Sequence, residues 1–268
     1  MMKNYYKDRD DTLRARFDGV ATQYEEYRLS YPKELFQDIM RYSDKPHNAL
    51  EIGIGTGKAT APFLKAGISV LAIEPNPKMA DIAIEKNAGY GHLKILNGKF
   101  EDYTFNHEFD LVYAASSFQW LRSENRMELI GGCLKQNGIF AKFKTVTIVD
   151  PEESIGSRLL YDIYCDILPD YLPKDRSPKV KSWDEFEQAG FGSFEHRDYY
   201  KKCLFDSDRY ISFMNTYTEY LALDEKLRKL FEDRIAEEIG AREITIIQKC
   251  TLDMATYGKY GFTVTNAK

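Results

Sequence analysis

The sequence predicts an α/β fold in which a doubly wound, mostly parallel sheet of seven strands is capped by helices. Between residues 47 and 144, five short apolar runs alternate with helix-like stretches, the pattern of parallel strands joined by right-handed crossovers. After residue 144 the alternation stops, and helical insertions separate two more strand-like runs. The 268 residues are 43% hydrophobic and 29% charged, an ordinary globular composition. This length fits a single domain over 1–268 with insertions.

Five parallel strands are expected at 49–52, 69–73, 93–96, 109–114 and 138–143. Helix start and stop signals separate these runs. Asn76 before Pro77 is typical of an N-cap followed by proline at the first helical position. Gly67 fits the end of the preceding helix. Pro62 is expected in the first turn of that helix, because an interior proline would cost about 3 kcal/mol.

The later part of the chain supplies the last two strands and the helical caps. Strands are expected at 194–205 and 249–257, the C-terminal one antiparallel. The insertions 151–190 and 206–240 are expected to cap one end of the sheet. The second insertion contains an amphipathic helix over 224–239. Its apolar face comprises Leu227, Leu230, Phe231, Ile235 and Ile239.

The N-terminal segment 1–32 is expected to form a lid at the carboxyl edge of the sheet, where open α/β folds bind ligands. Phe17, Ala21, Tyr24 and Arg28 recur at i, i+4, i+7 and i+11 and therefore share one helical face. Core packing explains Phe17 and Ala21, but it does not explain an arginine on the same stripe. Arg28 is therefore a candidate site residue.

Charge and spacing patterns argue against several function classes. The 37 Lys and Arg residues against 42 Asp and Glu give a net charge of -5 without a long block of like charge, so no nucleic-acid partner is expected. No run approaches the roughly 18 apolar residues of a membrane span, and the start lacks a secretory signal pattern. We therefore expect a cytoplasmic protein without a membrane partner. No metal is expected, because the histidine and cysteine spacings match no metal site.

The densest functional signal is the glycine-rich stretch 50–58, where a short strand runs through a loop into a helix. Glycines let the backbone turn sharply and let a ligand approach closely, while a helix N-terminus offers unpaired N–H groups. Glu74 follows Gly53 by 21 residues, at the end of an apolar run. This is the position of an acidic residue that accepts hydrogen bonds from ribose hydroxyls. Loop and acid together predict a nucleoside ligand rather than a mere turn.

Two ligands remain in contention for this loop. A dinucleotide fingerprint requires glycine at the sixth position from Gly53, and Lys58 stands there. Glu51, two residues before the first glycine, would repel a pyrophosphate but could orient an ammonium or sulfonium group. The pattern therefore favours S-adenosylmethionine (SAM) over NAD.

Several short motifs occur together with this loop. They are Glu51-x-Gly53-x-Gly55-x-Gly57, Glu74-Pro75-Asn76-x-x-Met79, Phe100-Glu101-Asp102, Phe109-Asp110-Leu111-Val112 with Ser117-Phe118-Gln119-Trp120-Leu121, and Leu134-Lys135-x-x-Gly138. In combination they resemble the Rossmann-like class I SAM-dependent methyltransferases. The likeness is closest to the small-molecule branch that includes trans-aconitate methyltransferases and relatives of quinone-biosynthesis methyltransferases. It extends to Phe17-Asp18-x-x-Ala21-x-x-Tyr24 and Arg28-x-x-Tyr31-Pro32, and so covers about residues 15–145.

The resemblance implies a role for each matching position. Gly53, Gly55 and Gly57 would line the methionine part of SAM, Glu74 would hold the ribose, Asn76 and Met79 would flank the adenine beside Pro75, Phe100 and Glu101 would close the adenine pocket, and Ala115 and Ser116 would pass beneath the methionine. Two positions depart from the branch. Lys99 stands where an aspartate often contacts the adenine amino group. Gln119 stands where histidine is frequent, which removes a candidate general base.

The expected function is SAM-dependent methyl transfer to a small-molecule acceptor, such as a carboxylate or hydroxyl oxygen. Displacement at a sulfonium depends on alignment, which can supply roughly 7–11 kcal/mol. Arg28 would clamp a carboxylate of the acceptor or of SAM, and Tyr24 would orient the sulfonium or the substrate. The tyrosines of 161–171 and 210–220 would line the acceptor pocket or fill the core of the cap. The alternatives are a SAM-binding or S-adenosylhomocysteine-binding protein without transfer activity, and an NAD-dependent oxidoreductase.

Overall fold

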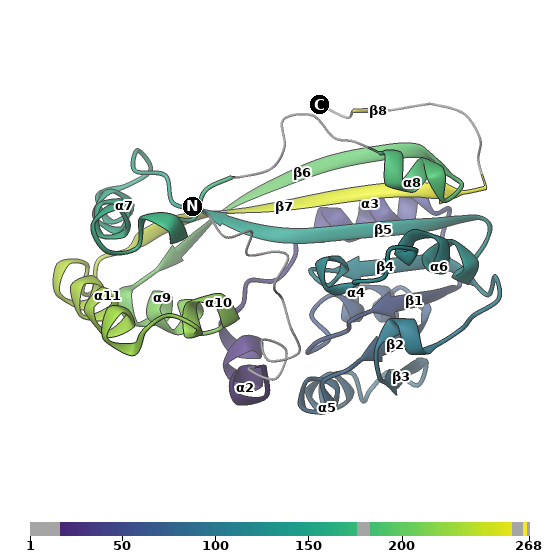
Figure 1. Ribbon diagram of the computed structural model, residues 1–268, viewed down its shortest axis with the longest axis horizontal. Helices are drawn as coiled ribbons and strands as arrows, with labels where there is room; N and C mark the ends of the chain where they lie inside the picture. Colours follow the sequence, from purple (N-terminus) through teal and green to yellow (C-terminus); the bar gives the residue numbers. More distant parts are fainter. Residues whose placement is uncertain (1–16, 176–182, 259–264, 267–268) are drawn as a thin grey trace.

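One sheet runs through the whole molecule in the strand order β3-β2-β1-β4-β5-β7-β6-β8 (Figure 1). The structure is a computed structural model, and it describes residues 17–175, 183–258 and 265–266. The strands are β1 (Asn48–Ile52), β2 (Ser69–Glu74), β3 (Leu93–Asn97), β4 (Phe109–Ala115), β5 (Leu134–Ile148), β6 (Phe191–Phe205), β7 (Ile244–Tyr257) and β8 (Thr265–Asn266). Strands β1 to β5 are parallel, and β7 is antiparallel to both β5 and β6. The predicted seven-stranded sheet with an antiparallel C-terminal strand is confirmed. The two-residue β8, parallel to β6, is an addition.

Helices cover both faces of the parallel part of the sheet. One face packs against α3 (Lys33–Tyr42), α4 (Thr60–Lys65) and α5 (Pro77–Lys86). The other face packs against α6 (Arg126–Cys133), α8 (Asp184–Gln188) and the short 3-10 helices η1 (Phe100–Asp102) and η2 (Phe118–Trp120). The chain order reverses between β1 and β4, which lie side by side. The carboxyl ends of strands at such a reversal form the usual ligand crevice of open α/β sheets.

The local helix signals hold in the structure. The Asn76 side chain accepts a hydrogen bond from the backbone N–H of Met79 at 3.1 Å, and Pro77 is the first residue of α5. Pro62 is the third residue of α4 and therefore lies in its first turn. Gly67 ends the turn after α4 with a φ of 81°. These signals act through neighbouring backbone groups, so the tertiary fold does not alter them.

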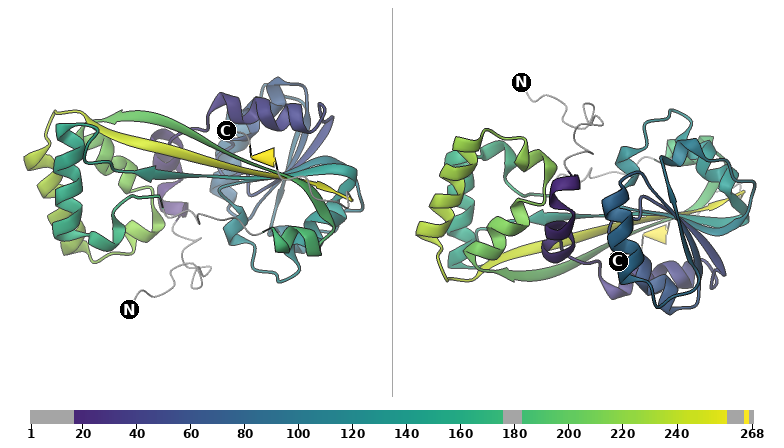
Figure 2. Two further views of the ribbon diagram at one scale, coloured as in Figure 1. Left: turned by 90° about the horizontal axis from the view of Figure 1, so that it is seen from above. Right: turned by 90° about the horizontal axis from the view of Figure 1, so that it is seen from below.

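Strands β5 and β7 are much longer than the sequence pattern predicted, and β6 begins three residues before its predicted start. Strands β5, β6 and β7 continue beyond the parallel sheet as a long ribbon whose far end carries α7 (Ile155–Ile167), α9 (Ser207–Met214), α10 (Thr218–Leu221) and α11 (Glu225–Glu238) (Figures 1 and 2). Pairing of β5 with β7 continues to Ile148 and Ile247. The four helices enclose their own core, which includes Leu160, Tyr164, Tyr210, Phe213, Phe231 and Ile235. We call this group of four helices the cap.

The predicted cap differs from the structure in two respects. The interval 151–190 divides between two places, since α7 lies in the cap while α8 packs Phe186 against Phe140 of the sheet. The interval 206–240 contains α9, α10 and α11, all of which belong to the cap. Leu230 on α11 is 52% exposed, whereas Phe231 and Ile235 are fully buried. The apolar face of α11 is therefore narrower than predicted, because only part of the helix meets α7 and α9.

Helix α2 (Phe17–Tyr27) lies between the cap and the parallel sheet, where it contacts α9 on one side and α5 on the other (Figure 1). Ala21 is buried on its inner face. Arg28 follows directly, and its backbone N–H donates to the carbonyl of Tyr24 at 3.1 Å. Residues 1–16 of the predicted lid fall outside the described residues. Within those that are described, no helix has the length and apolar character needed to cross a membrane.

Candidate active site

A cavity of about 1350 Å³ opens at the carboxyl ends of the parallel strands and extends under the cap. One end is bounded by the loops after β1, β2, β3 and β4. The other end is bounded by residues 144–147 of β5, residues 170–174 after α7, and residues 214–220 of α9, α10 and the turn between them. The N-terminal segment closes a side between the two ends. The cavity is thus continuous from the glycine loop to the cap.

Most residues predicted for the site line this cavity. They are Tyr24, Arg28, Gly53, Gly55, Glu74, Pro75, Asn76, Met79, Phe100, Glu101, Ala115 and Ser116. Glu51 and Gly57 lie elsewhere: neither is on the cavity wall. The fold therefore brings together residues from α2, four strand ends and two helices that are scattered over about the first 116 positions.

The glycines of the loop have different surroundings. Gly53, Gly55 and Gly57 all have positive φ, of 73°, 57° and 76°, a region that favours glycine. A Cβ atom on Gly55 would have only the Met79 sulfur nearby, at 4.0 Å. A Cβ on Gly57 would instead meet the buried Asn87 amide at 2.8 Å. Gly55 therefore keeps space open at the cavity, while Gly57 allows the loop to pack against α5.

The Glu74 carboxylate is held at the edge of the cavity by backbone groups. It is 7% exposed. Its Oε2 accepts a hydrogen bond from the N–H of Gly55 at 2.7 Å, and its Oε1 accepts one from the N–H of Asn76 at 2.9 Å. The carboxylate thereby links the loop after β1 to the loop after β2, and it lines the cavity there.

Glu51 lies behind the glycine loop rather than on the cavity wall. Its side chain is fully buried, and its Oε2 accepts hydrogen bonds from the Thr60 hydroxyl at 2.6 Å and the Tyr113 hydroxyl at 2.8 Å. Its Oε1 has no hydrogen-bond partner. Burial raises the pKa of Glu51 to about 8. Glu51 was expected to orient a cationic ligand, directly or through water, but its side chain does not line the cavity.

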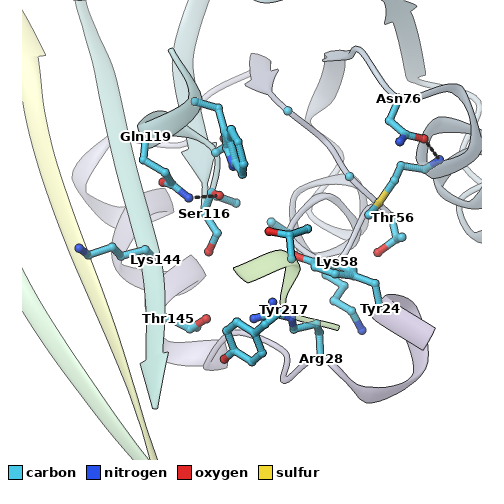
Figure 3. A pocket seen from close by; sticks show the side chains of 18 of the residues that line it. Tyr24, Arg28, Thr56, Lys58, Asn76, Ser116, Gln119, Lys144, Thr145 and Tyr217 are labelled. Carbon is cyan, nitrogen blue, oxygen red and sulfur yellow. Dashed lines mark hydrogen bonds between the residues drawn. The ribbon is translucent and has the colours of Figure 1, made fainter. Parts of the chain in front are cut away.

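The turn after β4 is strained at Ser116. Its φ is 57°, a conformation that costs a non-glycine residue of order 1–3 kcal/mol. Three hydrogen bonds hold it. Its N–H donates to the Phe143 carbonyl at 2.7 Å, and its hydroxyl accepts from the Tyr31 hydroxyl at 2.9 Å. Its carbonyl accepts from the Gln119 amide at 2.6 Å, a bond that Figure 3 shows. The surrounding structure thus fixes a polar turn on the cavity wall.

Arg28 bridges the N-terminal segment and the cap. Its Nη2 donates to the carbonyl of Thr216 at 3.0 Å, and its guanidinium carbon lies 3.4 Å from the centre of the Tyr217 ring (Figure 3). Tyr24 lies on the other side, at 5.2 Å. The Arg28 Nε is buried without a hydrogen-bond partner. Arg28 lines the cavity, and an arginine on a cavity wall can hold an anionic group.

Helix α2 also contacts the glycine-loop end of the cavity. The Glu25 carboxylate lies 2.5 Å from the Lys86 ammonium of α5 and 3.5 Å from the Lys58 ammonium of the glycine loop. Burial opposes ionisation of Glu25, but the Lys86 hydrogen bond and the Lys58 charge outweigh it and lower its pKa. The N-terminal segment therefore contacts both ends of the cavity.

Several cavity residues carried no clear signal in the sequence. Thr145 lies on a part of β5 that was predicted to follow the strand, and Tyr31 was part of a motif without an assigned role. Both expectations for the cap tyrosines apply in part: Tyr171, Tyr217 and Tyr220 line the cavity, while Tyr164 and Tyr210 are buried in the cap core. Sequence spacing does not separate these two groups, because burial of each tyrosine depends on how the helices of the cap pack against one another.

Comparisons with known proteins agree with this architecture. The family described as "Methyltransferase domain" matches residues 50–141. An uncharacterised methyltransferase of Bacillus cytotoxicus is 30% identical over 182 residues, which cover 65% of this chain and 81% of the relative. A probable S-adenosylmethionine-dependent methyltransferase of Saccharomyces cerevisiae is 29% identical over 164 residues, 57% of this chain and 55% of the relative. An uncharacterised methyltransferase of Oceanobacillus iheyensis is 33% identical over 113 residues, 42% of this chain and 50% of the relative. The chain thus spans about half the length of the last two relatives.

Solved structures share the fold at low sequence identity. A putative type II methyltransferase from Anaeromyxobacter dehalogenans has a TM-score of 0.58 at 15% identity, over 85% of this chain and 97% of that one. The phosphoethanolamine N-methyltransferase 2 of Haemonchus contortus, solved with phosphomonomethylethanolamine and S-adenosylhomocysteine, has a TM-score of 0.54 at 13% identity, over 92% of this chain and 60% of that one. With the family match and the Bacillus relative, the chain belongs to the class I SAM-dependent methyltransferases, whose methyl donor is SAM.

Proposed function

We propose that this protein transfers a methyl group from SAM to a small-molecule acceptor held under the cap. The observation that carries the proposal is the single cavity that joins the glycine loop to the cap. An acceptor bound at the cap end would face the donor without crossing solvent. A closed site of this kind excludes water and aligns the two reactants.

The residues at the loop end fit a nucleoside sulfonium donor. A Cβ on Gly55 would enter the open space beside Met79, so the glycine leaves room for a ligand against the backbone. Glu74 would accept hydrogen bonds from the ribose hydroxyls, since its carboxylate is already fixed at the cavity edge. Asn76, Pro75 and Met79 would flank the adenine, with Phe100 and Glu101 closing its pocket and Ala115 and Ser116 beneath the methionine part. When bound, SAM supplies a methyl group activated by the sulfonium.

The chain itself would contribute positioning rather than acid–base catalysis. The Gln119 amide is committed to the Ser116 carbonyl, which leaves it no role as a base. Tyr24 and Arg28 stand at the junction of the two ends of the cavity, where they would orient the reactants. The part played by the cap and α2 is to exclude water.

The cap end supports an acceptor with an anionic group and an apolar body. The guanidinium of Arg28, which lines the cavity, would hold a carboxylate. The walls beside it are formed by Leu172, Met214 and the Tyr171 ring, which suit an apolar or aromatic skeleton. A carboxylate or hydroxyl oxygen is the proposed methyl-accepting atom. A carboxylate needs no base because it is already ionised, whereas a hydroxyl group would pass its proton to water as the new O–C bond forms.

The proposal is tested in two steps. Isothermal titration calorimetry with SAM and with S-adenosylhomocysteine (SAH) measures donor binding, with NADH as the control ligand. Transfer of a deuterated methyl group from SAM into a metabolite extract, followed by mass spectrometry, then identifies the acceptor. Failure to bind SAM would reject the donor assignment. Binding of SAM and SAH with no labelled product from any extract would identify a SAM-binding protein without transfer activity.

A further inference from the structure

The surroundings of the Glu51 carboxyl group offer little stabilisation to an ionised carboxylate. It is fully buried, and both hydroxyl donors reach the same oxygen, Oε2, while Oε1 has none. Unlike most buried carboxylates it has no lysine, arginine or histidine partner among the described residues, although buried charges in proteins are normally paired.

Within the described part of the chain, the neighbouring elements supply no positive charge either. From α4 comes only the Thr60 hydroxyl, and from β4 the Tyr113 hydroxyl. From β2, Glu74 adds a second negative charge, and the Tyr31 hydroxyl before α3 also feels the charge of Glu51. Every titratable group that faces Glu51 is therefore acidic or neutral at pH 7.

Glu51 nevertheless lies next to the proposed donor site. Ile52 and Gly53, the two residues that follow it, line the cavity, as does Tyr31. The carboxyl group is thus one layer of protein behind the loop. A positive charge bound on the loop would act on it through a medium with a low dielectric constant, where charges interact more strongly than in water.

We propose that Glu51 is protonated in the free protein and gives up its proton when the sulfonium donor binds, so that this buried carboxyl group favours the donor over its demethylated product. The inference rests on the proposed function. In the step, the O–H bond of the carboxylic acid breaks, its electron pair stays on the oxygen, and the proton passes to the buffer. The resulting carboxylate faces a ligand that carries one more positive charge than SAH, since SAH has a neutral thioether in place of the sulfonium.

The sign of the pH dependence follows from this exchange. Burial raises the pKa of Glu51 to about 8 in the free protein, and a nearby positive charge lowers the pKa of a carboxyl group. Below about pH 8 the donor must displace a proton, so its affinity increases as the pH rises. One proton released per ligand corresponds to about tenfold in affinity per pH unit. The neutral sulfur of SAH gives a weaker dependence.

Calorimetry tests this without an acceptor. Titrations of SAM in two buffers with different ionisation enthalpies give the number of protons released on binding, for the wild-type protein and for Glu51→Gln. The α-amino group of the ligand also titrates near neutral to slightly alkaline pH, but it does so with both proteins and cancels in the difference. Below about pH 8 we expect the wild type to release more protons than Glu51→Gln. We also expect the ratio of the wild-type SAM affinity to the Glu51→Gln SAM affinity to rise about tenfold per pH unit. The corresponding ratio for SAH should rise less.

Equal proton release from the two proteins would overturn the inference while leaving SAM binding, and hence the proposed function, intact. Absence of SAM binding to the wild type would instead reject the proposed function. A rise with pH that is the same for SAM and SAH would show that Glu51 does not discriminate between donor and product.

A second variant keeps the test decisive if Glu51→Gln does not fold. Tyr113→Phe removes one hydroxyl donor to Glu51, which favours the neutral acid and should move proton release to higher pH. Tyr164→Phe, which removes a buried hydroxyl in the cap core, is the matched control and should leave the pH dependence unchanged. Infrared difference spectra provide a direct readout, because the C=O stretch of a protonated carboxylic acid should disappear when SAM is added. Its persistence in the SAM-bound wild type would contradict proton release.

Discussion

The guanidinium of Arg28 stacks on the ring of Tyr217, with 3.4 Å between the guanidinium carbon and the ring centre. This contact joins the end of α2 to the cap, and three residues earlier Glu25 joins α2 to Lys86 of α5. One short helix therefore spans both ends of the cavity. Any movement that separates the cap from the parallel sheet must break one of these two attachments.

This arrangement predicts that α2 acts as a lid. When SAH binds, amide hydrogen exchange should slow in peptides covering residues 17–32, because closure strengthens both attachments. Peptides from α11, on the far side of the cap, should show little change. Equal exchange of residues 17–32 with and without ligand would mean that α2 is scaffold.

Arg28→Ala should impair methyl transfer more than it impairs folding. Hydrogen bonds to charged groups contribute about 1.5–3 kcal/mol, so we expect a loss of about tenfold to a hundredfold in kcat/KM. Arg41→Ala on α3, an arginine that is 71% exposed, is the control and should leave activity unchanged. Full activity of Arg28→Ala, with unchanged thermal unfolding, would remove Arg28 from the site.

Glu74→Ala should weaken SAM and SAH to a similar degree, because the proposed ribose contacts are common to both ligands. The loss of charged hydrogen bonds predicts a fall of about tenfold or more in affinity, measured by calorimetry. Glu85→Ala, an exposed acid on α5, should bind both ligands normally. Unchanged SAM affinity in Glu74→Ala would reject the ribose assignment.

Two glycine variants separate ligand exclusion from packing. Gly55→Ala and Gly57→Ala place alanine in a left-handed conformation, which costs about 1–2 kcal/mol in each case. Only Gly57→Ala adds a contact of 2.8 Å with the buried Asn87, so it should lower the unfolding temperature further. Relative to its loss of stability, Gly55→Ala should lose more SAM affinity than Gly57→Ala does. If Gly55→Ala is the less stable of the two, the open space beside Gly55 is not kept for a ligand.

Glu51 should also make folding stability depend on pH. Its pKa is raised from 4.5 to about 8 by burial, so the folded chain holds a proton that the unfolded chain releases above its own pKa. The stabilisation is fully present below pH 4.5 and is lost as the pH rises through about 8, by about 1.4 kcal/mol per pH unit in that window. Urea unfolding measures the free energy of unfolding of the wild type and of Glu51→Gln. As the pH rises, the wild type should lose stability relative to Glu51→Gln. A difference that stays constant with pH would show that Glu51 is ionised in the folded protein.

Much of the donor half of the protein could be predicted from the sequence. The first five strands, the Asn76 cap, the turn at Gly67 and the acid at Glu74 were all readable, because each depends on residues within one turn or one strand. The reversal between β1 and β4 follows from the order of parallel strands and right-handed crossovers. It places the predicted cofactor residues at one edge of the sheet before any side-chain contact is known.

The tertiary structure decided what depends on partners far away in the chain. The length of β5 is set by pairing with β7, which lies more than 100 residues later, so the apolar run 138–143 could not show where the strand begins or ends. The exposure of Leu230 could not be predicted either, because it depends on how far α7 and α9 extend. The contact of Arg28 with Tyr217 could not be predicted because Tyr217 comes from the cap. Glu51 and Gly57 belong to the same motif as Gly55, yet the fold turns them away from the cavity. A motif fixes spacing along the chain, but the side of the loop that meets a ligand is determined by which neighbouring helix packs against the other side.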